Sequence, residues 1–152
     1  MLLTDLLSIE RIRIPLESRS KDDLLRELVD LITRENRVDD PEDVLRAVME
    51  REAVLSTGIG NGVAIPHGKS SAVPDLRMAA GLTREPVDFD ALDGQPVRLF
   101  FMLVGPETAA GQHIKALSRI SRLVRREEVR ERLISTRDAN EFLRALREAE
   151  GA

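Results

Sequence analysis

The chain contains two histidines, His67 and His113, and each follows a glycine-containing segment. His67 stands between Pro66 and Gly68, just after the short apolar run 63–65. An imidazole can act as a base, a metal ligand or a nucleophile that accepts a phosphoryl group. Because proline and glycine both interrupt strands, we expect His67 at the edge or rim of a sheet, with its ring held in place. A surface-turn histidine without a role is the plainer alternative, and so constrained a backbone disfavours it.

His113 falls in the first turn of a helix that we expect to begin near Gly111. Leu117 and Ile120 follow it at helical spacing, which places His113 on the inward face. A helix N-terminus disfavours an imidazolium, so the ring is expected to be neutral and to make one hydrogen bond. Taken alone, the residue is more simply a buried core histidine with one satisfied nitrogen.

Arg51 lies near the end of a predicted helix, shortly before the glycine-containing loop. A guanidinium close to His67 would bind an oxyanion through two parallel hydrogen bonds. A solvated arginine beside the helix C-terminus explains the residue equally well. The alternating glycines at 58, 60 and 62 suggest a nucleotide loop, but they lack the spacing of a dinucleotide or P-loop motif.

Composition excludes several classes of function. The 152 residues include no cysteine, so thiol catalysis and zinc–thiolate sites are absent. The four aromatic residues are all Phe, and the net charge is -4, which argues against base-stacking modules and against general attraction to nucleic acid or anionic membranes. No apolar run approaches the roughly 20 residues of a membrane helix, and the N-terminus has no basic flank. We expect a cytoplasmic protein that neither inserts into a membrane nor binds nucleic acid.

Helical and alternating patterns follow one another along the chain. We expect strands at 11–16, 63–65, 76–83 and 97–104, the last of them central because it is apolar on both faces. Capping residues and apolar periodicity predict helices at 20–34, 40–52, 111–124, 127–134 and 138–149. These elements predict one α/β domain over residues 1–152, with a mixed parallel/antiparallel sheet of about five strands flanked by helices.

The stretch from Arg51 to Lys69, REAVLSTGIGNGVAIPHGK, resembles the signature of the fructose/mannitol-type (type 2) enzyme IIA domains. These domains belong to the phosphoenolpyruvate-dependent sugar phosphotransferase system. The resemblance covers nearly the whole chain, including FDALDGQPV at 89–97 and the helix with His113. The form TGIGNG is most similar to the nitrogen-regulatory IIA branch. Asn61 stands where sugar-transporting members often carry Glu, which implies one negative charge fewer near the phosphoryl site and favours the regulatory branch.

The resemblance implies a phosphotransferase. His67 would take a phosphoryl group from the phosphohistidine of a small carrier, either HPr or its nitrogen-branch counterpart NPr. Arg51 matches the active-site arginine of the family, and His113 matches its second histidine. The resemblance also implies a loop around the phosphoryl site, made by Thr57, Gly58, Gly60 and Asn61. It implies no cofactor and no metal.

Three functions remain open from the sequence. In the first, phosphorylation regulates the binding of this protein to targets such as kinases or potassium transporters. In the second, the chain is the IIA component of a fructose/mannitol-type transporter and passes its phosphoryl group to a IIB domain. The third, a metal-dependent hydrolase built on His67 and His113, needs further ligands that no motif supplies.

Overall fold

The fold is arranged around a long central strand, β6 (Val97–Gly105). The computed structural model describes residues 1–34 and 38–151, so the end of the predicted domain at Ala152 lies outside the described residues. In these ranges there are six strands and five α-helices, with short 3-10 turns at Leu3–Asp5, Ile9–Arg11 and Glu107–Ala109. The remaining strands are β1 (Ile12–Leu16), β2 (Gly58–Gly60), β3 (Val63–Ala64), β4 (His67–Lys69) and β5 (Arg77–Val87). The helices are α1 (Lys21–Thr33), α2 (Pro41–Val54), α3 (Ala110–Arg125), α4 (Glu127–Ile134) and α5 (Ala139–Gly151).

The sheet is mixed, as predicted from the sequence. Its strand order is β1-β5-β6-β3-β2, and β4 pairs with β6 further along the side that β3 occupies. Strands β5 and β6 run antiparallel, as do β2 and β3. The pairings β1–β5, β3–β6 and β4–β6 are parallel. β6 therefore holds together the strands that precede it in the chain, including the short strand that contains His67.

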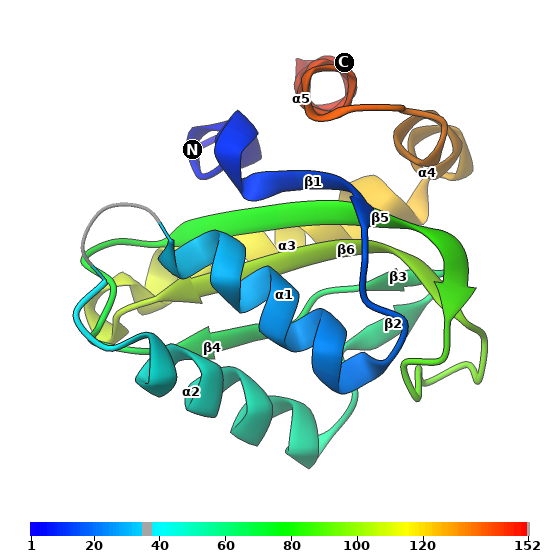
Figure 1. Cartoon of the computed structure of the whole chain (residues 1–152). Helices are drawn as coiled ribbons and strands as arrows, with labels where there is room; N and C mark the ends of the chain where they lie inside the picture. Colours follow the sequence, from blue (N-terminus) through cyan, green and yellow to red (C-terminus); the bar gives the residue numbers. More distant parts are fainter. Residues whose placement is uncertain (35–37, 152) are drawn as a thin grey trace.

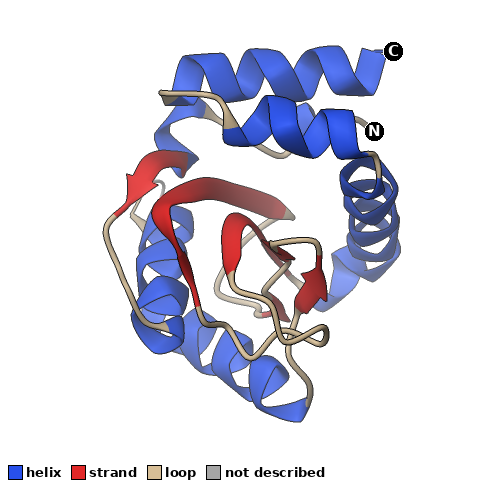
Figure 2. Cartoon of the chain, turned by 90° about the vertical axis from the view of Figure 1, so that its right-hand side faces the viewer, coloured by secondary structure: helices blue, strands red, loops and turns tan. Residues whose placement is uncertain are grey.

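Helices cover both faces of this sheet (Figures 1 and 2). Side chains of β6 alternate between the two faces, because successive residues of a strand point in opposite directions. Leu99, Phe101 and Leu103 pack in the apolar cluster on the side of α3, α4 and α5. Phe100, Met102 and Val104 pack in the cluster on the side of α1 and α2. The prediction of a strand that is apolar on both faces is confirmed.

Local capping signals set the starts of α1 and α2. The Ser20 hydroxyl accepts a hydrogen bond from the Asp23 N–H at 3.3 Å, and the Asp40 carboxylate accepts one from the Asp43 N–H at 3.2 Å. Both are N-caps of the expected type, and Pro41 occupies the first turn of α2. α2 continues to Val54, two residues beyond the predicted end, so its last turn presents Arg51 to the sheet's edge region.

Two segments that were expected to interrupt strands form strands instead. Gly58–Gly60 makes β2, which pairs with β3, and His67–Lys69 makes β4, which pairs with β6. Pro66 lacks an N–H, but its carbonyl accepts a hydrogen bond from the Leu103 N–H at 3.1 Å, so the chain stays beside β6. The breaker residues therefore bend the path of the chain without ending its pairing.

Gly68 is required by close packing of β4 against α2. A Cβ atom at Gly68 would lie 3.0 Å from the backbone nitrogen of Val48 and 3.1 Å from the carbonyl carbon of Ala47. Contacts this short exclude a side chain unless the helix moves. Since Gly68 faces α2, its neighbours His67 and Lys69 face the opposite side of the sheet.

Candidate active site

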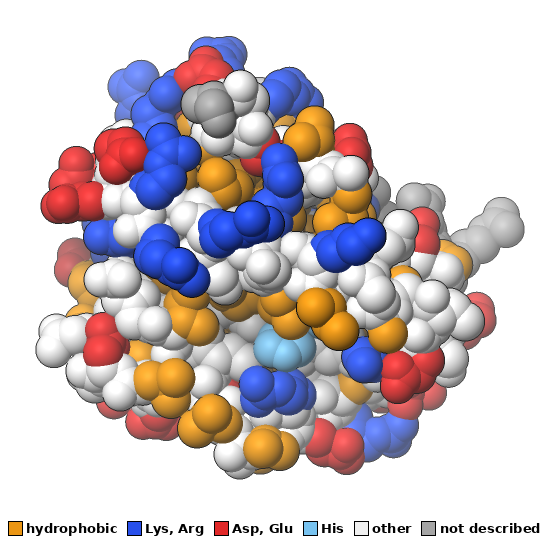
Figure 3. Space-filling view, turned by 180° about the vertical axis from the view of Figure 1, so that it is seen from behind, with side chains coloured by type: hydrophobic (Ala, Val, Ile, Leu, Met, Phe, Trp, Pro, Cys, Tyr) orange, Lys and Arg blue, Asp and Glu red, His pale blue; other side chains and the backbone are white. Residues whose placement is uncertain are grey.

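Imidazole atoms lie at the molecular surface in a shallow hollow, with cationic side chains beside them and apolar side chains around them (Figure 3). The exposed ring is that of His67, which is half-buried, because His113 is only 3% exposed. The two ring centroids are 5.5 Å apart, and the rings meet edge to face at 68°. The structure thus brings together the two histidines that the sequence singled out.

Two elements from distant parts of the chain create this pair. His67 begins β4 and points away from α2, toward the face of the sheet that α3 covers. His113 lies in the first turn of α3 and points inward from it. The prediction that His113 occupies the inward face of its helix is confirmed.

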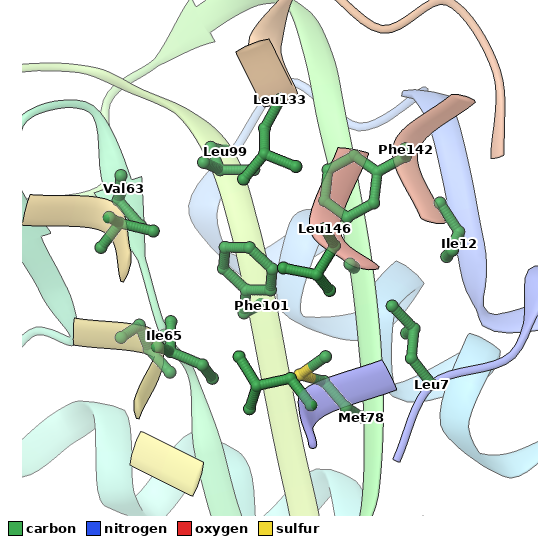
Figure 4. Packing of buried hydrophobic residues seen from close by; sticks show 14 of the residues in the cluster. Leu7, Ile12, Val63, Ile65, Met78, Leu99, Phe101, Leu133, Phe142 and Leu146 are labelled. Atoms are coloured by element: carbon green, nitrogen blue, oxygen red, sulfur yellow. The ribbon is translucent and has the colours of Figure 1, made fainter. Parts of the chain in front are cut away.

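The ring of His67 is fixed by a backbone hydrogen bond. Its Nδ1 lies 2.8 Å from the carbonyl oxygen of Ile65. Because a carbonyl can only accept, Nδ1 carries the proton and Nε2 keeps its lone pair. The Ile65 side chain is itself buried in the cluster on the α3 side (Figure 4), so the carbonyl that holds the ring is anchored by packing. This tautomer leaves the lone pair of Nε2 available to an incoming group.

Burial lowers the pKa of His67 below its usual value. The hydrogen bond to Ile65 raises this pKa, the positive charge of Arg51 lowers it, the carboxylate of Glu52 raises it, and Lys69 lowers it. Desolvation is the largest of these effects, because a charged ring loses its hydration when it is covered. His67 is therefore neutral at physiological pH.

Burial also lowers the pKa of His113, to about 4, and the neighbouring His67 and Lys69 act in the same direction. The ring is neutral, as predicted, although desolvation is the chief cause. The predicted single satisfied nitrogen is wrong for the described part of the chain, where neither Nδ1 nor Nε2 of His113 has a hydrogen-bond partner. A buried neutral imidazole with both nitrogens free can donate to, or accept from, a group placed beside His67.

Arg51 occupies the last turn of α2, close enough to His67 for its charge to act on that ring. One guanidinium nitrogen, Nη1, donates to the carbonyl oxygen of Leu55 at 2.9 Å. This bond satisfies a carbonyl at the helix end and orients the side chain. A guanidinium has five N–H donors, so the group can hold an anion while it keeps this bond.

Of the predicted loop residues, Thr57 is buried, and Gly58 and Gly60 belong to β2. Thr57 donates both its N–H and its hydroxyl to the carboxylate of Glu52, at 2.9 Å and 2.5 Å. Asn61 forms the turn between β2 and β3, where its φ of 58° lies in the left-handed region. Asparagine tolerates that region better than most residues, which gives a structural reason for its presence.

The structure does not bring Asn61 to His67. Val63 pairs with Leu99 of β6, whereas His67 pairs with Leu103, four residues further along the strand. Four residues of strand correspond to about 13 Å, and Asn61 precedes Val63 at the far end. The turn conformation gives a structural reason for asparagine at position 61, and its effect on the charge at the phosphoryl site stays a prediction.

Two charged residues near the histidines were missed from the sequence. Lys69 shares the face of β4 with His67 and forms an ion pair with Glu107 at 3.4 Å. Its place follows from two-residue alternation once residues 67–69 are known to be a strand. Glu52, next to Arg51 in the chain, is buried. Nothing in the neighbouring sequence predicts this burial, because a glutamate in the last turn of a helix is usually solvated.

Other features of the molecule lie apart from this pair. A cavity of about 710 Å³ opens between the ends of β1 and β5, lined by residues 15–19 and 83–87. No cluster of three or more His, Cys, Asp or Glu side chains suited to a metal ion occurs among residues 1–34 and 38–151. Within those same ranges, no helix has the length and apolar character needed to cross a membrane.

Comparison with known proteins shows which family and which proteins the chain is similar to. Residues 5–149 match the family described as phosphoenolpyruvate-dependent sugar phosphotransferase system, EIIA 2. A nitrogen regulatory protein of Bradyrhizobium diazoefficiens is 40% identical over 146 residues, with 91% of this chain and 90% of that protein covered. The fructose-specific EIIABC component of Bacillus subtilis is 39% identical over 134 residues, or 88% of this chain, but the chain spans only 21% of that protein. Nitrogen regulatory protein IIA-Ntr from Neisseria meningitidis has a similar structure, with a TM-score of 0.88, 38% identity, and coverage of 95% of this chain and 98% of that one.

Proposed function

Because the chain belongs to the EIIA type 2 family of the phosphoenolpyruvate-dependent sugar phosphotransferase system, we propose that it carries a phosphoryl group on His67. The donor is the phosphohistidine of a small carrier protein, HPr or NPr. The observation that carries this proposal is the hydrogen bond between Nδ1 of His67 and the carbonyl of Ile65. It leaves a neutral ring with a free lone pair on Nε2, which is what a nucleophile toward phosphorus requires.

The transfer is a displacement at phosphorus. The lone pair of His67 Nε2 forms a new N–P bond while the N–P bond to the carrier's imidazole breaks, and the electron pair of that bond stays on the carrier's nitrogen. His67 Nδ1 keeps its proton and its bond to Ile65, so the positive charge that develops on the phosphorylated ring lies against a carbonyl oxygen. The protein contributes mainly by positioning the reacting groups and by offsetting the negative charge of the transferring phosphoryl group.

Arg51 and His113 supply that charge and position. The guanidinium offsets negative charge on the equatorial oxygens of the transferring group, and its planar donors suit two of them at once. His113, whose two nitrogens are free of protein partners within the described residues, offers a hydrogen bond to a third oxygen. The unmet hydrogen-bonding capacity of this buried ring supports a role for it in the phosphorylated state.

The test is phosphotransfer from phosphoenolpyruvate through enzyme I and HPr, followed by mass spectrometry of the intact chain and of its peptides. We expect one phosphoryl group on His67 in the wild type and none in His67→Gln. An unlabelled wild type, under conditions that label another EIIA type 2 protein, would show that the proposal is wrong. Label on a different residue would refute the assignment of His67.

We further propose that the protein is a regulatory IIA protein and not the IIA component of a sugar transporter. Similarity to a nitrogen regulatory protein over 90% of its length, and a TM-score of 0.88 to IIA-Ntr of Neisseria meningitidis, support this choice. The discriminating experiment mixes the phosphorylated chain with purified fructose-type and mannitol-type IIB domains. Retention of the phosphoryl group agrees with a regulatory role. Rapid transfer to either IIB domain favours the transporter alternative.

A further inference from the structure

The carboxylate of Glu52 is buried in the last turn of α2, with a side chain only 5% exposed. A buried charge is tolerated when it is paired and hydrogen-bonded. Glu52 meets both conditions, because Lys21 Nζ lies 2.9 Å from Oε2 and Thr57 donates through its N–H and its hydroxyl. Lys21 also lies over the ring of Phe89, 4.9 Å from its centroid. The start of α1, the end of α2 with the residues that follow it, and Phe89 are separated in the sequence but meet around this carboxylate and its lysine.

The hydrogen bonds continue from Thr57 to the imidazole of His67. The carbonyl of Thr57 accepts the N–H of Ile65 at 2.9 Å. The carbonyl of Ile65 then accepts Nδ1–H of His67 at 2.8 Å. Thr57 is the shared residue, since Glu52 holds its amide and hydroxyl while its carbonyl holds Ile65. An unbroken series of contacts therefore runs from Lys21 through Glu52, Thr57 and Ile65 to the reactive ring.

We propose that Glu52 and Thr57, with Lys21 as the counter-charge, are positioning residues that hold the Ile65 carbonyl in place and so keep His67 in the Nδ1–H tautomer. This inference rests on the proposed phosphoryl transfer at Nε2. Glu52 directly follows Arg51, so the same anchor fixes the backbone from which the guanidinium extends. Neither Glu52 nor Thr57 contacts the phosphoryl group in this scheme, and both act through His67 and Arg51.

The two side chains can be altered with little change of shape. Thr57→Val removes the hydroxyl and keeps the branched form, whereas Thr57→Ser keeps the hydroxyl. Glu52→Gln removes the charge and one acceptor oxygen. Ser70→Ala is the matched control, because the buried Ser70 hydroxyl donates to Asp43 of α2 at 2.5 Å but lies outside the series that leads to His67.

The first readout is the tautomer of His67, seen in the ¹⁵N shifts of its ring nitrogens in the unphosphorylated protein. We expect Nδ1–H alone in the wild type, Thr57→Ser and Ser70→Ala. Thr57→Val and Glu52→Gln should show a mixture of both tautomers. Because no phosphoryl donor is present, this measurement stands even if the wild type proves not to be a phosphoryl acceptor.

The second readout is the rate of transfer from phosphorylated HPr, with free energies of unfolding measured beside it. Thr57→Val and Glu52→Gln should lower kcat about 10-fold or more with little change in KM, because a misplaced nucleophile slows the chemical step. Thr57→Ser should restore the wild-type kcat. The inference is overturned if Thr57→Val loses stability as Ser70→Ala does but keeps the wild-type tautomer and kcat. Should Glu52→Gln fail to fold, the Thr57→Val and Thr57→Ser pair carries the test.

Discussion

The tautomer and charge of His67 are set by a few groups around its ring. The Ile65 carbonyl selects the tautomer, and burial keeps the ring neutral. Arg51 and Lys69 are cations near the ring, whereas the nearby Glu52 is already held by Lys21 and Thr57. The surroundings of Nε2 therefore favour an incoming anionic phosphoryl group over a proton.

Replacement of Arg51 should affect transfer far more than folding. In the proposed transfer, Arg51→Ala removes the donors to the equatorial oxygens, for which we expect a loss of about 10²-fold in kcat. Arg51→Lys keeps the charge but lacks the planar, two-pronged guanidinium. Its kcat should lie between those of the wild type and Arg51→Ala. The lost bond to the Leu55 carbonyl costs at most about 1 kcal/mol of unfolding free energy. Arg46→Ala, an exposed arginine on the same helix, is the control, and equal rates in Arg46→Ala and Arg51→Ala would contradict the assigned role.

The depressed pKa of His113 predicts acid destabilisation. An unfolded histidine titrates near 6.5, whereas burial lowers the pKa of His113 to about 4 in the fold. Between these values the unfolded chain binds more protons than the native one, so stability decreases as the pH falls below about 6.5. The stability of the wild type relative to His113→Gln should drop by on the order of 2 kcal/mol between pH 7 and pH 5.

Urea unfolding of both proteins across that pH range measures the effect. Carboxylates and His67 titrate in both chains, so the difference between them isolates His113. Parallel stability profiles for the two proteins would mean that His113 titrates normally in the fold.

At the scale of elements, the site depends on how closely α2 approaches β4. α2 carries Arg51 and Glu52, and β4 carries His67, so the distance between these elements sets the distance between the guanidinium and the imidazole. Gly68 is the contact point, because its missing side chain allows the backbone of α2 to come against the strand. Local packing and the geometry of the site are therefore linked.

Gly68→Ala should test that link. The added methyl group would meet the backbone at Val48 and Ala47 and push the helix outward, at a cost of about 1–3 kcal/mol in unfolding free energy. The displaced Arg51 should also slow phosphoryl transfer. Gly111→Ala is the control, because a Cβ there meets nothing within 4 Å and a helical alanine adds about 0.5–1 kcal/mol of stability. Equal stability in Gly68→Ala and the wild type would show that α2 is not confined by β4.

Local signals predicted the helices well, and non-local pairing explains what they missed. Each of the features that were predicted depends on a few consecutive residues. They are the helix caps at Ser20 and Asp40 and the apolar run of β6. β4 was missed because Pro66 and Gly68 are strand breakers, and its pairing partner lies 36 residues away, as from His67 to Leu103. Burial of Glu52 likewise depends on Lys21, which belongs to another helix. His67, Arg51 and His113 were found through the family resemblance as much as through residue chemistry.

Viewed as a whole, the molecule presents an apolar rim around the hollow that exposes His67 (Figure 3). Large apolar side chains are exposed close in sequence to Arg51, at the end of α2, and next to His113 in α3: Val54, Leu55 and Ile114. A cluster of exposed apolar groups beside a candidate active-site residue is typical of a protein–protein contact. In the proposed transfer the donor is a protein, so this rim is the surface on which we expect the phosphorylated carrier to dock.

Introducing a charge on this rim should weaken docking while sparing the chemistry. Ile114 is 67% exposed, so Ile114→Glu should leave the fold intact and raise KM for phosphorylated HPr by roughly 10-fold, because a carboxylate must then be desolvated in the contact. Ile9→Glu is the matched control, since Ile9 is 42% exposed and lies before β1, at the opposite edge of the sheet. Phosphoramidate, a small donor that needs no docking surface, should phosphorylate wild type and Ile114→Glu at the same rate. Equal KM values for Ile114→Glu and Ile9→Glu would place the carrier elsewhere, and a slow reaction of Ile114→Glu with phosphoramidate would mean that the substitution disturbs His67 itself.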